Sequence, residues 1–389
     1  MKVALLTDAP YCRDVRAQRT VRALVDSGIS LVVFDQGFEV EVSRKILPEG
    51  VKHFSSIIPS GKIARFAWHA RNQLAAHSNL DANNQAAYDV LCESAPDIIH
   101  LVNPFLGDAV LRYIGENPAC RLVYEAYEYW PEYLYDEEFG VNKSIRNHLA
   151  NTEKELLQQC GAFITVSEPI AEFYERIAAP QTSYVIYNAN VKESATLDQP
   201  EITVGAPLKI VFSGQFAADR NVDMLLQALN LMKHQVSVTL LGRGPQSEHY
   251  KQLIAQLDSA RSAAIKNPVP ANELIAELEN YDVGIHLVSP QTLQQDGAAP
   301  NKIFDYIRAN LGIVSVETKG VKSLGLDGCI AYVTPLCVRE LAEVLDELAA
   351  DSVRVLAMKR EAAQLKRQYS SVHELQKIKS LYQKLMTNE

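Results

Sequence analysis

Short apolar segments alternate with longer helical patterns along most of the chain, and this alternation restricts the fold more than any other feature of the sequence. The apolar segments are continuous rather than alternating, so we expect strands that are buried on both faces. Such strands, each followed by a helix, are typical of a parallel, doubly wound α/β sheet. The strands expected in the first half are Val3–Leu6, Leu31–Phe34, Ile98–Val102, Leu122–Tyr124 and Ala162–Val166. The helices expected there include Val15–Ser27, Asp108–Asn117, Lys143–Cys160 and Pro169–Ile177.

The alternation pauses at Val191–Leu208, a polar, proline-containing segment without a period, and then begins again. Further strands are expected at Ile210–Phe212, Ser237–Leu241, Ala263–Ile265, Val283–Leu287 and Ile313–Val316. Helices are expected at Val222–Met232, Glu248–Leu257, Ala271–Glu279 and Asn301–Ala309, and from Val338 onward. A chain of 389 residues usually exceeds one core, so we expect two Rossmann-like domains, residues 1–195 and 205–371. Ligands of such domains bind at the carboxyl ends of the strands, here in a cleft between the two halves.

Composition excludes several classes of function. The formal net charge of −9 argues against a nucleic-acid partner, because nucleic-acid binding depends on neutralising phosphates. The six cysteines are scattered, without a CxxC pair, which predicts free thiols rather than a metal site or a disulfide framework. The first apolar run is too short for a signal peptide, and no run approaches the ~20 residues of a membrane span. We therefore expect a cytoplasmic protein.

The segment Gln295–Val316 has the pattern of an anion site. A Gly/Ala/Pro loop leads into a helix at Asn301, and the free N–H groups of a helix start bind anions. Lys302 in the first turn is disfavoured by the helix dipole unless an anion offsets it, and Asp305 is placed to accept hydrogen bonds from hydroxyls. Phosphate plus hydroxyls suggests a nucleotide or a sugar phosphate. The alternative is an ordinary capped helix before a buried strand.

Two glycine loops precede this segment. Ser213–Val222 follows a strand and contains Gly214, which permits close backbone approach, and Arg220, which stands before a helix and has the fork geometry that binds phosphate. Arg220 is equally compatible with a solvated surface position. The second loop, Gly242–Pro245, is a weaker signal because Gly-Pro turns are common. The first strand is not followed by GxGxxG, which argues against a dinucleotide cofactor in the first half.

Taken in order, these segments resemble the nucleotide-binding half of retaining glycosyltransferases of the GT-B fold, the group 1 family (glycosyltransferase family 4-like) related to glycogen synthase and sucrose synthase. The segments that carry the resemblance in the second half are the Gly214–Arg220 loop, LLGRGP, VPANELIAELENYDVGIHLVSP and PNKIFDYIRANLGIV. Those in the first half are PDIIH, YEAYE, GAFITVS and VIYNAN. The C-terminal stretch, about residues 372–389, resembles the last helix of these enzymes, which crosses back to the first domain.

The resemblance implies a site for a nucleotide-diphosphate sugar. Asp305 takes the position of the carboxylate that holds the ribose hydroxyls, and Arg220 that of a lysine on the diphosphate. Gln215 stands where many members have an arginine, so one cation is missing there, and Lys302 is a candidate to supply it. The implied donor site comprises Gly214, Gln215, Arg220, Gly242, Val269, Ala299, Pro300, Asn301, Lys302 and Asp305. No metal and no cofactor are expected if these cations and the helix dipole carry the charge.

Two departures from the family pattern concern the chemistry. The family's first glutamate, which contacts the donor sugar, is replaced by Gly297, with Asp296 beside it. The frequent His-Glu pair of the first domain appears as Tyr127-Glu128. Asp296, Glu128 and Tyr127 are therefore the catalytic candidates. Either Asp296 substitutes for the glutamate, or the sugar is held differently, or activity is lost.

The acceptor candidates lie in the first half. Arg13 follows the first strand, His100 stands at the end of an apolar strand and Glu125 lies just past another; each is equally compatible with an exposed or buried structural role. The segment 60–74 has apolar residues at helical spacing beside a basic stripe, which suits either an acceptor or membrane-surface element or, as we favour, ordinary packing on a sheet. Contact with the inner face of the membrane therefore stays an alternative to a purely cytoplasmic location.

The sequence thus predicts a GT-B glycosyltransferase that transfers a sugar from a UDP- or GDP-sugar to a glycan, lipid-linked or small-molecule acceptor, with retention. The enzymatic alternative is a sugar-nucleotide epimerase of similar fold. The non-enzymatic alternative is a glycosyltransferase-like partner subunit that has lost chemistry, suggested by Gly297 and Tyr127.

Overall fold

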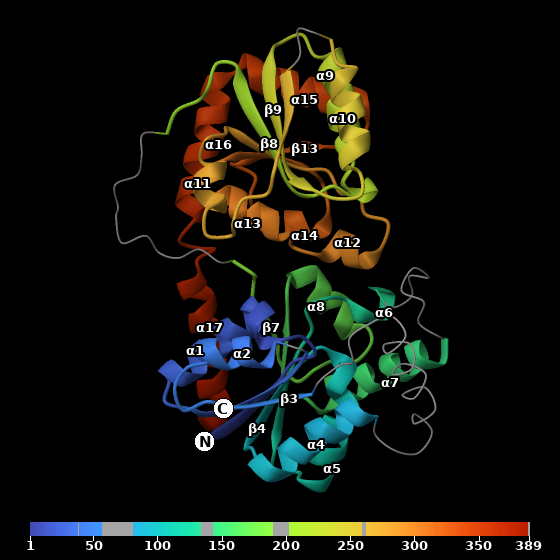
Figure 1. Cartoon of the computed structure of the whole chain (residues 1–389), viewed down its shortest axis with the longest axis vertical. Coiled ribbons are helices and arrows are strands. Elements are labelled where there is room, and N and C mark those ends of the chain that lie inside the picture. Colours follow the sequence, from blue (N-terminus) through green and yellow to red (C-terminus); the bar gives the residue numbers. More distant parts are fainter. Residues whose placement is uncertain (38, 57–80, 134–142, 190–201, 259–261, 388–389) are drawn as a thin grey trace. The chain divides into compact units, whose positions relative to one another are not determined.

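The computed structural model describes residues 1–37, 39–56, 81–133, 143–189, 202–258 and 262–387 (Figure 1). The chain forms two compact units, one of residues 1–186 with 375–389 and one of residues 187–374. Each contains a parallel sheet with helices, so the predicted fold class is confirmed. The basic segment 60–74 and most of the predicted linker, 191–201, lie outside the described residues.

The first unit is built on a seven-stranded sheet in the order β3-β2-β1-β4-β5-β6-β7. Its strands are β1 (Lys2–Leu6), β2 (Ser30–Gln36), β3 (Lys52–Ser56), β4 (Ile98–Val102), β5 (Arg121–Glu125), β6 (Ala162–Thr165) and β7 (Ser183–Val185). Its helices are α1 (Val15–Asp26), α2 (Val40–Ile46), α4 (Ala82–Ser94), α5 (Gly107–Glu116), α6 (Trp130–Tyr133), α7 (Lys143–Gln159), α8 (Glu168–Glu175) and α17 (Ser371–Thr387). The central strands are almost wholly buried, as a sheet covered on both faces requires.

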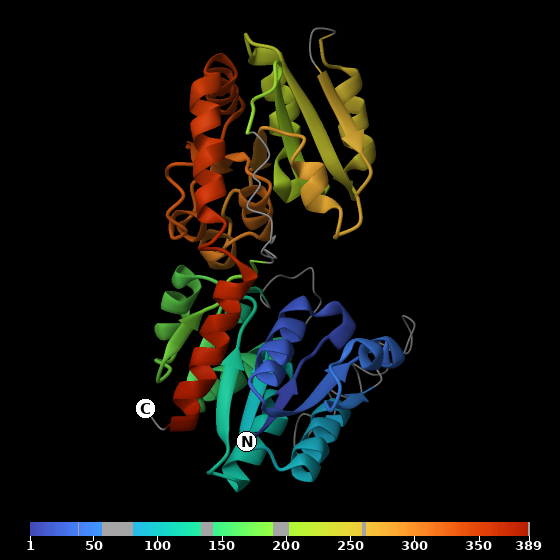
Figure 2. The ribbon, with the colours of Figure 1, turned by 90° about the vertical axis from the view of Figure 1, so that its left-hand side faces the viewer.

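The last helix, α17, belongs to the first unit from Leu375 onward, and its first four residues belong to the second. Ile378, Leu381 and Tyr382 join the same buried cluster as Val123 of β5 and Ile164 of β6. Figure 2 shows this helix in red beside the strands of the first unit. The chain therefore returns to its first unit after completing the second.

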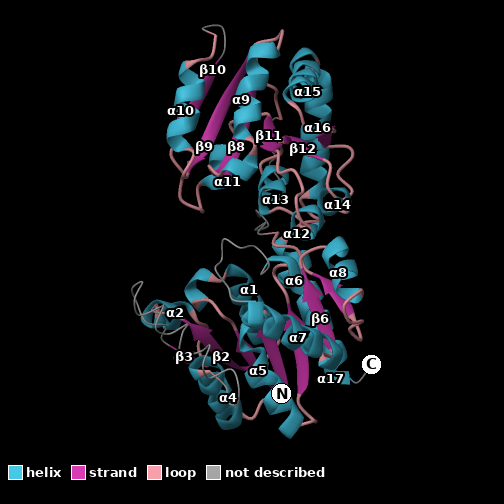
Figure 3. Ribbon diagram, turned by 90° about the vertical axis from the view of Figure 1, so that its right-hand side faces the viewer, coloured by secondary structure: helices cyan, strands magenta, loops and turns pink. Residues whose placement is uncertain are grey.

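The second unit is built on a six-stranded sheet in the order β10-β9-β8-β11-β12-β13. Its strands are β8 (Leu208–Gln215), β9 (Val236–Arg243), β10 (Ser262–Lys266), β11 (Val283–His286), β12 (Gly312–Val316) and β13 (Ile330–Val333). Its helices are α9 (Val222–Leu231), α10 (Ser247–Ala255), α11 (Leu274–Leu278), α12 (Leu293–Gly297), α13 (Asn301–Arg308), α14 (Lys319–Lys322), α15 (Val338–Ala350) and α16 (Ser352–Leu365). Helices α9, α10 and α15 pack together, and α13 packs with α16, so helices flank the sheet as Figure 3 shows.

In both sheets the chain order reverses beside the first strand. β1 lies between β2 and β4, and β8 lies between β9 and β11. Because the connections on either side of such a point run to opposite faces, the loops at the carboxyl ends of the two strands separate and leave room for a ligand. Ligand sites are therefore expected at the carboxyl ends of β1 and β4 and of β8 and β11.

The apolar pattern of the sequence predicts the central strands but not three others. β3, β7 and β13 were not predicted, and each lies at an edge of its sheet. β3 reads KHFSS, and none of its residues is fully buried, so it lacks the apolar run by which buried strands are recognised. The predicted loop at Gln295 is also corrected, because residues up to Gly297 form α12, which is capped by the Thr292 side chain.

Candidate functional site

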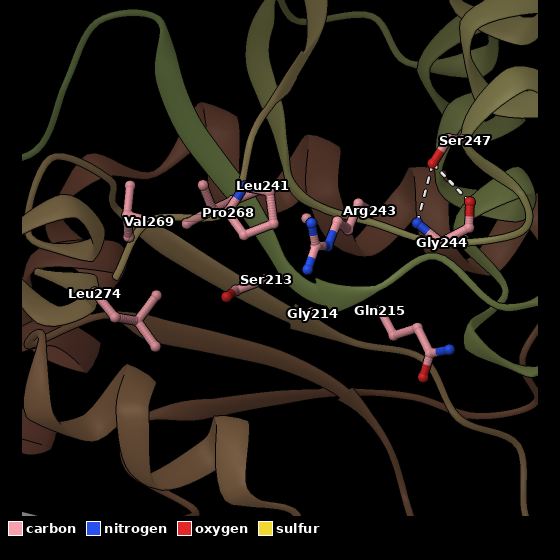
Figure 4. A pocket seen from close by; sticks show the side chains of 11 residues that line it. Ser213, Gly214, Gln215, Leu241, Arg243, Gly244, Ser247, Pro268, Val269 and Leu274 are labelled. Carbon is pink, nitrogen blue, oxygen red and sulfur yellow. Dashed lines mark hydrogen bonds between the residues drawn. The ribbon is translucent and has the colours of Figure 1, made fainter. Parts of the chain in front are cut away.

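A cavity of about 710 Å³ opens in the second unit at the carboxyl ends of β8 and β9. Its lining comes from the ends of these two strands, the loop after β9, the start of α10, the loop after β10 and the start of α11 (Figure 4). The lining residues are Ser213, Gly214, Gln215, Leu241, Gly242, Arg243, Gly244, Ser247, Pro268, Val269 and Leu274. Its size suits a ligand of nucleotide dimensions, and its place is the usual one for a ligand in an open α/β sheet.

Glycines let the two strand ends approach each other closely. A Cβ on Gly242 would lie only 1.9 Å from the carbonyl oxygen of Gly214, so this position accepts no side chain. Gly214 itself has φ +139°, a conformation that residues with side chains rarely adopt. The backbone, rather than side chains, therefore forms this part of the cavity, and a charged ligand can approach it.

The cavity has an apolar end and a polar end. Pro268, Val269 and Leu274 lie together on one side in Figure 4, with Gln215, Gly244 and Ser247 on the other. The Ser247 hydroxyl accepts a hydrogen bond from the Gly244 N–H at 3.0 Å and donates one to its carbonyl at 2.7 Å, which holds this turn. A ligand with a flat apolar ring at one end and polar groups at the other fits this distribution.

Arg243 is the one charged residue among the described residues that line the cavity. It is exposed at the end of β9, and no described residue forms an ion pair with it. The sequence analysis did not name it. The signal that was available is its place within the glycine loop LLGRGP, where a lone cation follows a buried strand.

Lys302 lies close beside Gly214. Its Nζ is 3.4 Å from the position that a Cβ on Gly214 would occupy and 4.2 Å from the centre of the Phe212 ring. Burial, and then the charge of Arg220, lower the pKa of Lys302 to about 7. No acidic residue occupies the first turn of α13 to offset this charge. Burial destabilises the charged form of Lys302, and an anion that binds beside it would stabilise that form.

Arg220, Asp305 and His286 interact electrostatically with Lys302. Burial raises the pKa of Asp305, and Arg308 and Lys302 oppose that rise. Burial, with Lys302 and Arg220 nearby, lowers the pKa of His286 well below its usual range. The Nε of Arg220 lies 3.5 Å from Asp219 Oδ1. His286 ends β11, Arg220 precedes α9, and Lys302 and Asp305 lie in α13, so three separate elements contribute to this charged group.

Most of the donor residues predicted from the sequence therefore lie in one region of the second unit. Gly214, Gln215, Gly242 and Val269 line the cavity, and Lys302 adjoins it. Arg220 and Asp305 are linked to Lys302 by charge without lining the cavity. Ala299 and Pro300 precede α13 and Asn301 begins it, where the Asn301 Oδ1 accepts a hydrogen bond from Asn188 Nδ2 at 3.1 Å.

Asp296 is engaged with α14. Its Oδ2 lies 2.9 Å from Lys319 Nζ, and its Oδ1 accepts a hydrogen bond from the Lys319 N–H at 3.0 Å. Gly320 of α14 packs closely against Ala298, the residue after α12, because a Cβ on Gly320 would lie 2.0 Å from the carbonyl oxygen of Ala298. Both oxygens of Asp296 are thus occupied in this conformation, and the side chain stabilises the start of α14.

His100 and Glu125, two of the three acceptor candidates, form a buried chain of hydrogen bonds. His100 is wholly buried, with Nδ1 2.8 Å from the Tyr382 hydroxyl and Nε2 2.9 Å from Glu125 Oε2. An imidazole with both nitrogens bonded has no free atom for a ligand. The third candidate, Arg13, is exposed and pairs with Glu39.

Tyr127 lies in a polar cluster at the ends of β1, β4 and β5. Its hydroxyl donates to Asp14 Oδ1 at 3.0 Å, and the Arg16 guanidinium lies 4.4 Å from the centre of its ring. Its N–H donates to Asn103 Oδ1 at 3.1 Å. Glu128 is partly buried beside it, and its carbonyl oxygen accepts from the Tyr174 hydroxyl.

Two carboxyls of this cluster were missed by the sequence analysis. Asn103 Nδ2 donates to Asp8 Oδ1 at 2.9 Å, and burial raises the pKa of Asp8 to about 6. Burial also raises the pKa of Asp14, whose Oδ1 caps α1 through the Ala17 N–H. Their position in the sequence could have indicated them. Both residues follow β1, which borders the point where the strand order reverses.

The described residues contain neither a cluster of metal ligands nor a membrane-spanning helix. No group of three or more His, Cys, Asp or Glu among them is arranged to hold a metal ion. No helix in the described part of the chain is both long and apolar enough to cross a membrane.

No family model matches the sequence, and no curated protein matches it significantly. Solved structures do match over the whole chain. Sucrose-phosphate synthase from Thermosynechococcus elongatus is 12% identical with a TM-score of 0.71, covering 100% of both chains. HepE from Anabaena, solved with UDP-glucose, is 13% identical with a TM-score of 0.67, covering 98% of this chain and 99% of its own.

A third neighbour is WaaG, a glycosyltransferase involved in lipopolysaccharide biosynthesis. It is 14% identical with a TM-score of 0.66, and the match covers 97% of this chain and 99% of WaaG. At these identities the comparisons establish architecture rather than activity. The chain has the GT-B fold of these glycosyltransferases, as the order of its sequence motifs predicted.

Proposed function

We propose that this protein is a glycosyltransferase that uses a nucleotide-diphosphate sugar as donor. The observation that carries the proposal is the cavity of about 710 Å³ at the ends of β8 and β9, with a glycine backbone, an apolar end and neighbouring cations. A base fits the apolar end, and a diphosphate fits the backbone N–H groups and cations near Gly214 and Lys302. That HepE is solved with UDP-glucose supports a uridine nucleotide.

The donor chemistry follows from charge. The bond between the sugar C1 and the diphosphate oxygen breaks, and the acceptor oxygen bonds to C1 on the same face. A diphosphate oxygen takes the acceptor proton. Arg220 and Lys302, with the start of α13, stabilise the negative charge that develops on the leaving diphosphate. This arrangement supports a retaining reaction in which these groups supply the positive charge.

The acceptor is proposed to be a glycan or a lipid-linked or small molecule with free hydroxyls. The polar cluster of Asp8, Asp14, Asn103 and Tyr127 supports this, because carboxylates and amides accept and donate hydrogen bonds to sugars. It lies at the carboxyl ends of the first unit's strands, and Glu128 adjoins it. These residues are the proposed acceptor site.

A second candidate is a partner subunit that binds the nucleotide without turnover. The observation in its favour is that Gly297 supplies no carboxylate and that Asp296 is occupied by Lys319. The two functions are separated by measuring, on the same preparation, the binding of UDP and GDP by calorimetry and the release of nucleotide diphosphate from UDP- and GDP-sugars. Nucleotide binding with donor turnover supports the enzyme. Binding without turnover on a panel of acceptors supports the subunit, and absence of binding to both nucleotides overturns both.

A further inference from the structure

Gln215 and Arg243 are direct neighbours across two parallel strands. They end β8 and β9, and the strand register pairs them, just after the pair Gly214 and Gly242. Adjacent strands lie ~5 Å apart, so the side chains of a register pair reach the same space. Both side chains line the cavity, and in Figure 4 the Arg243 guanidinium lies between the apolar residues and Gln215.

Arg243 has the features of a ligand-binding cation rather than of a structural one. It alone among the described lining residues is charged, and no described residue forms an ion pair with it. Here the guanidinium extends into the cavity beside the backbone of Gly214, where no side chain competes for a ligand.

We propose that Arg243 binds the diphosphate group of the donor and supplies positive charge at the strand ends, where its register partner Gln215 is uncharged. This inference rests on the proposed function. The guanidinium presents two parallel N–H donors, which match two oxygens of one phosphate. Lys302, close to Gly214, contributes a second positive charge from a different element, α13. The diphosphate is then held by cations that come from β9 and from α13, with the glycine backbone between.

The phosphate is favoured over the base as the group that Arg243 recognises. The base has its own surface in Pro268, Val269 and Leu274, which carry no charge. Arg243 lies next to the polar residues Gln215 and Gly244. A guanidinium forms stronger hydrogen bonds with an anionic phosphate than with a neutral base, because charge-assisted hydrogen bonds are about twice as strong as neutral ones.

The test uses a series of ligands and a charge relocation. Calorimetry on the full chain measures the affinity for uridine, UMP and UDP, with guanosine, GMP and GDP in parallel. Arg243→Gln is expected to weaken diphosphate binding by about tenfold or more and nucleoside binding by less than about twofold. The double variant Gln215→Arg with Arg243→Gln moves the cation to the paired strand and is expected to recover most of the lost affinity.

Arg243→Lys provides a matched control, because it keeps the charge and loses the fork. It is expected to fall between wild type and Arg243→Gln. Thermal unfolding establishes that each variant is folded, which is expected because Arg243 is exposed.

Each outcome has a defined meaning. Equal UDP affinity for wild type and Arg243→Gln overturns the inference while leaving the proposed function intact. An equal loss for uridine and UDP also overturns it, since the contact would then be to the nucleoside. A wild-type protein that binds neither UDP nor GDP overturns the proposed function itself, and this inference with it.

Discussion

The hydroxyl of Tyr382 lies 2.8 Å from Nδ1 of His100, although 282 residues separate the two in the chain. The other ring nitrogen of His100 lies 2.9 Å from Glu125, so one buried chain of hydrogen bonds joins α17, β4 and β5. The last helix is thereby fixed to the first sheet by a polar contact as well as by apolar packing. His100 serves this role instead of offering an atom to an acceptor.

Removing the Tyr382 hydroxyl should destabilise the first unit. Tyr382→Phe leaves one buried nitrogen of His100 without its partner, which costs about 1–3 kcal/mol. Urea unfolding of the full chain, followed by circular dichroism, measures this loss. Tyr184→Phe is the matched control, because no hydrogen bond of the Tyr184 hydroxyl is found among the described residues. Equal stability of Tyr382→Phe and wild type would contradict the structural role.

Glu153 should make stability depend on pH. Its Oε1 lies 2.6 Å from the hydroxyl oxygens of both Tyr124 and Tyr174, within hydrogen-bond distance, and burial raises the pKa of Glu153 from 4.5 to about 7. Between these two values the folded state holds a proton that the unfolded state has released. Stability from this group is therefore full below about pH 4.5 and is lost as the pH rises through about 7.

Glu153→Gln tests this relation. The amide cannot ionise, so the variant should be more stable than wild type above pH 7, by up to about 3 kcal/mol. Urea unfolding at a series of pH values between 4.5 and 8 measures the difference. Glu155→Gln, an exposed position on the same helix, should leave the pH profile unchanged. Parallel profiles for Glu153→Gln and wild type would refute the prediction.

Nucleotide binding should be coupled to proton uptake by Lys302. With a pKa of about 7, its ammonium is mostly deprotonated at pH 8, and a bound diphosphate favours the charged form. Calorimetric titration with UDP at pH 8, in buffers of different ionisation enthalpy, should show uptake approaching about one proton. Lys302→Arg stays charged and should show no uptake. A wild-type enthalpy that is the same in all buffers would rule out the coupling.

Asp305 and Arg220 should contribute to nucleotide-diphosphate affinity. Asp305→Ala and Arg220→Ala should each weaken UDP or GDP binding by about 1–3 kcal/mol, the scale of charge-assisted hydrogen bonds. Lys251→Ala removes an exposed cation that pairs with Glu248 on α10 and should leave affinity unchanged. Unchanged affinity in both test variants would show that these two residues do not contact the ligand.

Gly242 should tolerate no side chain. A Cβ there would lie 1.9 Å from the Gly214 carbonyl oxygen, so Gly242→Ala must separate the ends of β8 and β9. We expect a loss of about 1–3 kcal/mol in stability and a loss of UDP binding. Gly115→Ala is the control, because a Cβ there has no neighbour within 4 Å and alanine favours the helix α5. A Gly242→Ala variant with wild-type stability and affinity would contradict this packing.

The sequence predicts the centre of each sheet better than its edges. The strand Ile98–Val102 was predicted with the bounds that the structure shows, because a strand covered on both faces must be apolar throughout. β3 was not predicted because this edge strand reads KHFSS and has no apolar run, whereas β13 was not predicted although its sequence, IAYV, is apolar. The doubly wound class follows from the order of strands and helices alone, and the sequence predicts that order.

The glycines and the helix start near the second unit's cavity could also be predicted from the sequence, because both have local sequence signatures. The interaction partner of each charged side chain could not be predicted. Asp296 reads as a free carboxylate in the sequence and is occupied by Lys319, and His100 reads as a strand-end histidine and is enclosed between Glu125 and Tyr382. Arg243 faces Gln215 only because β8 and β9 pair in one register. Local sequence determines where strands, turns and helix starts form, whereas the pairing of distant charges depends on packing between segments far apart in the chain, and only the tertiary structure decides it.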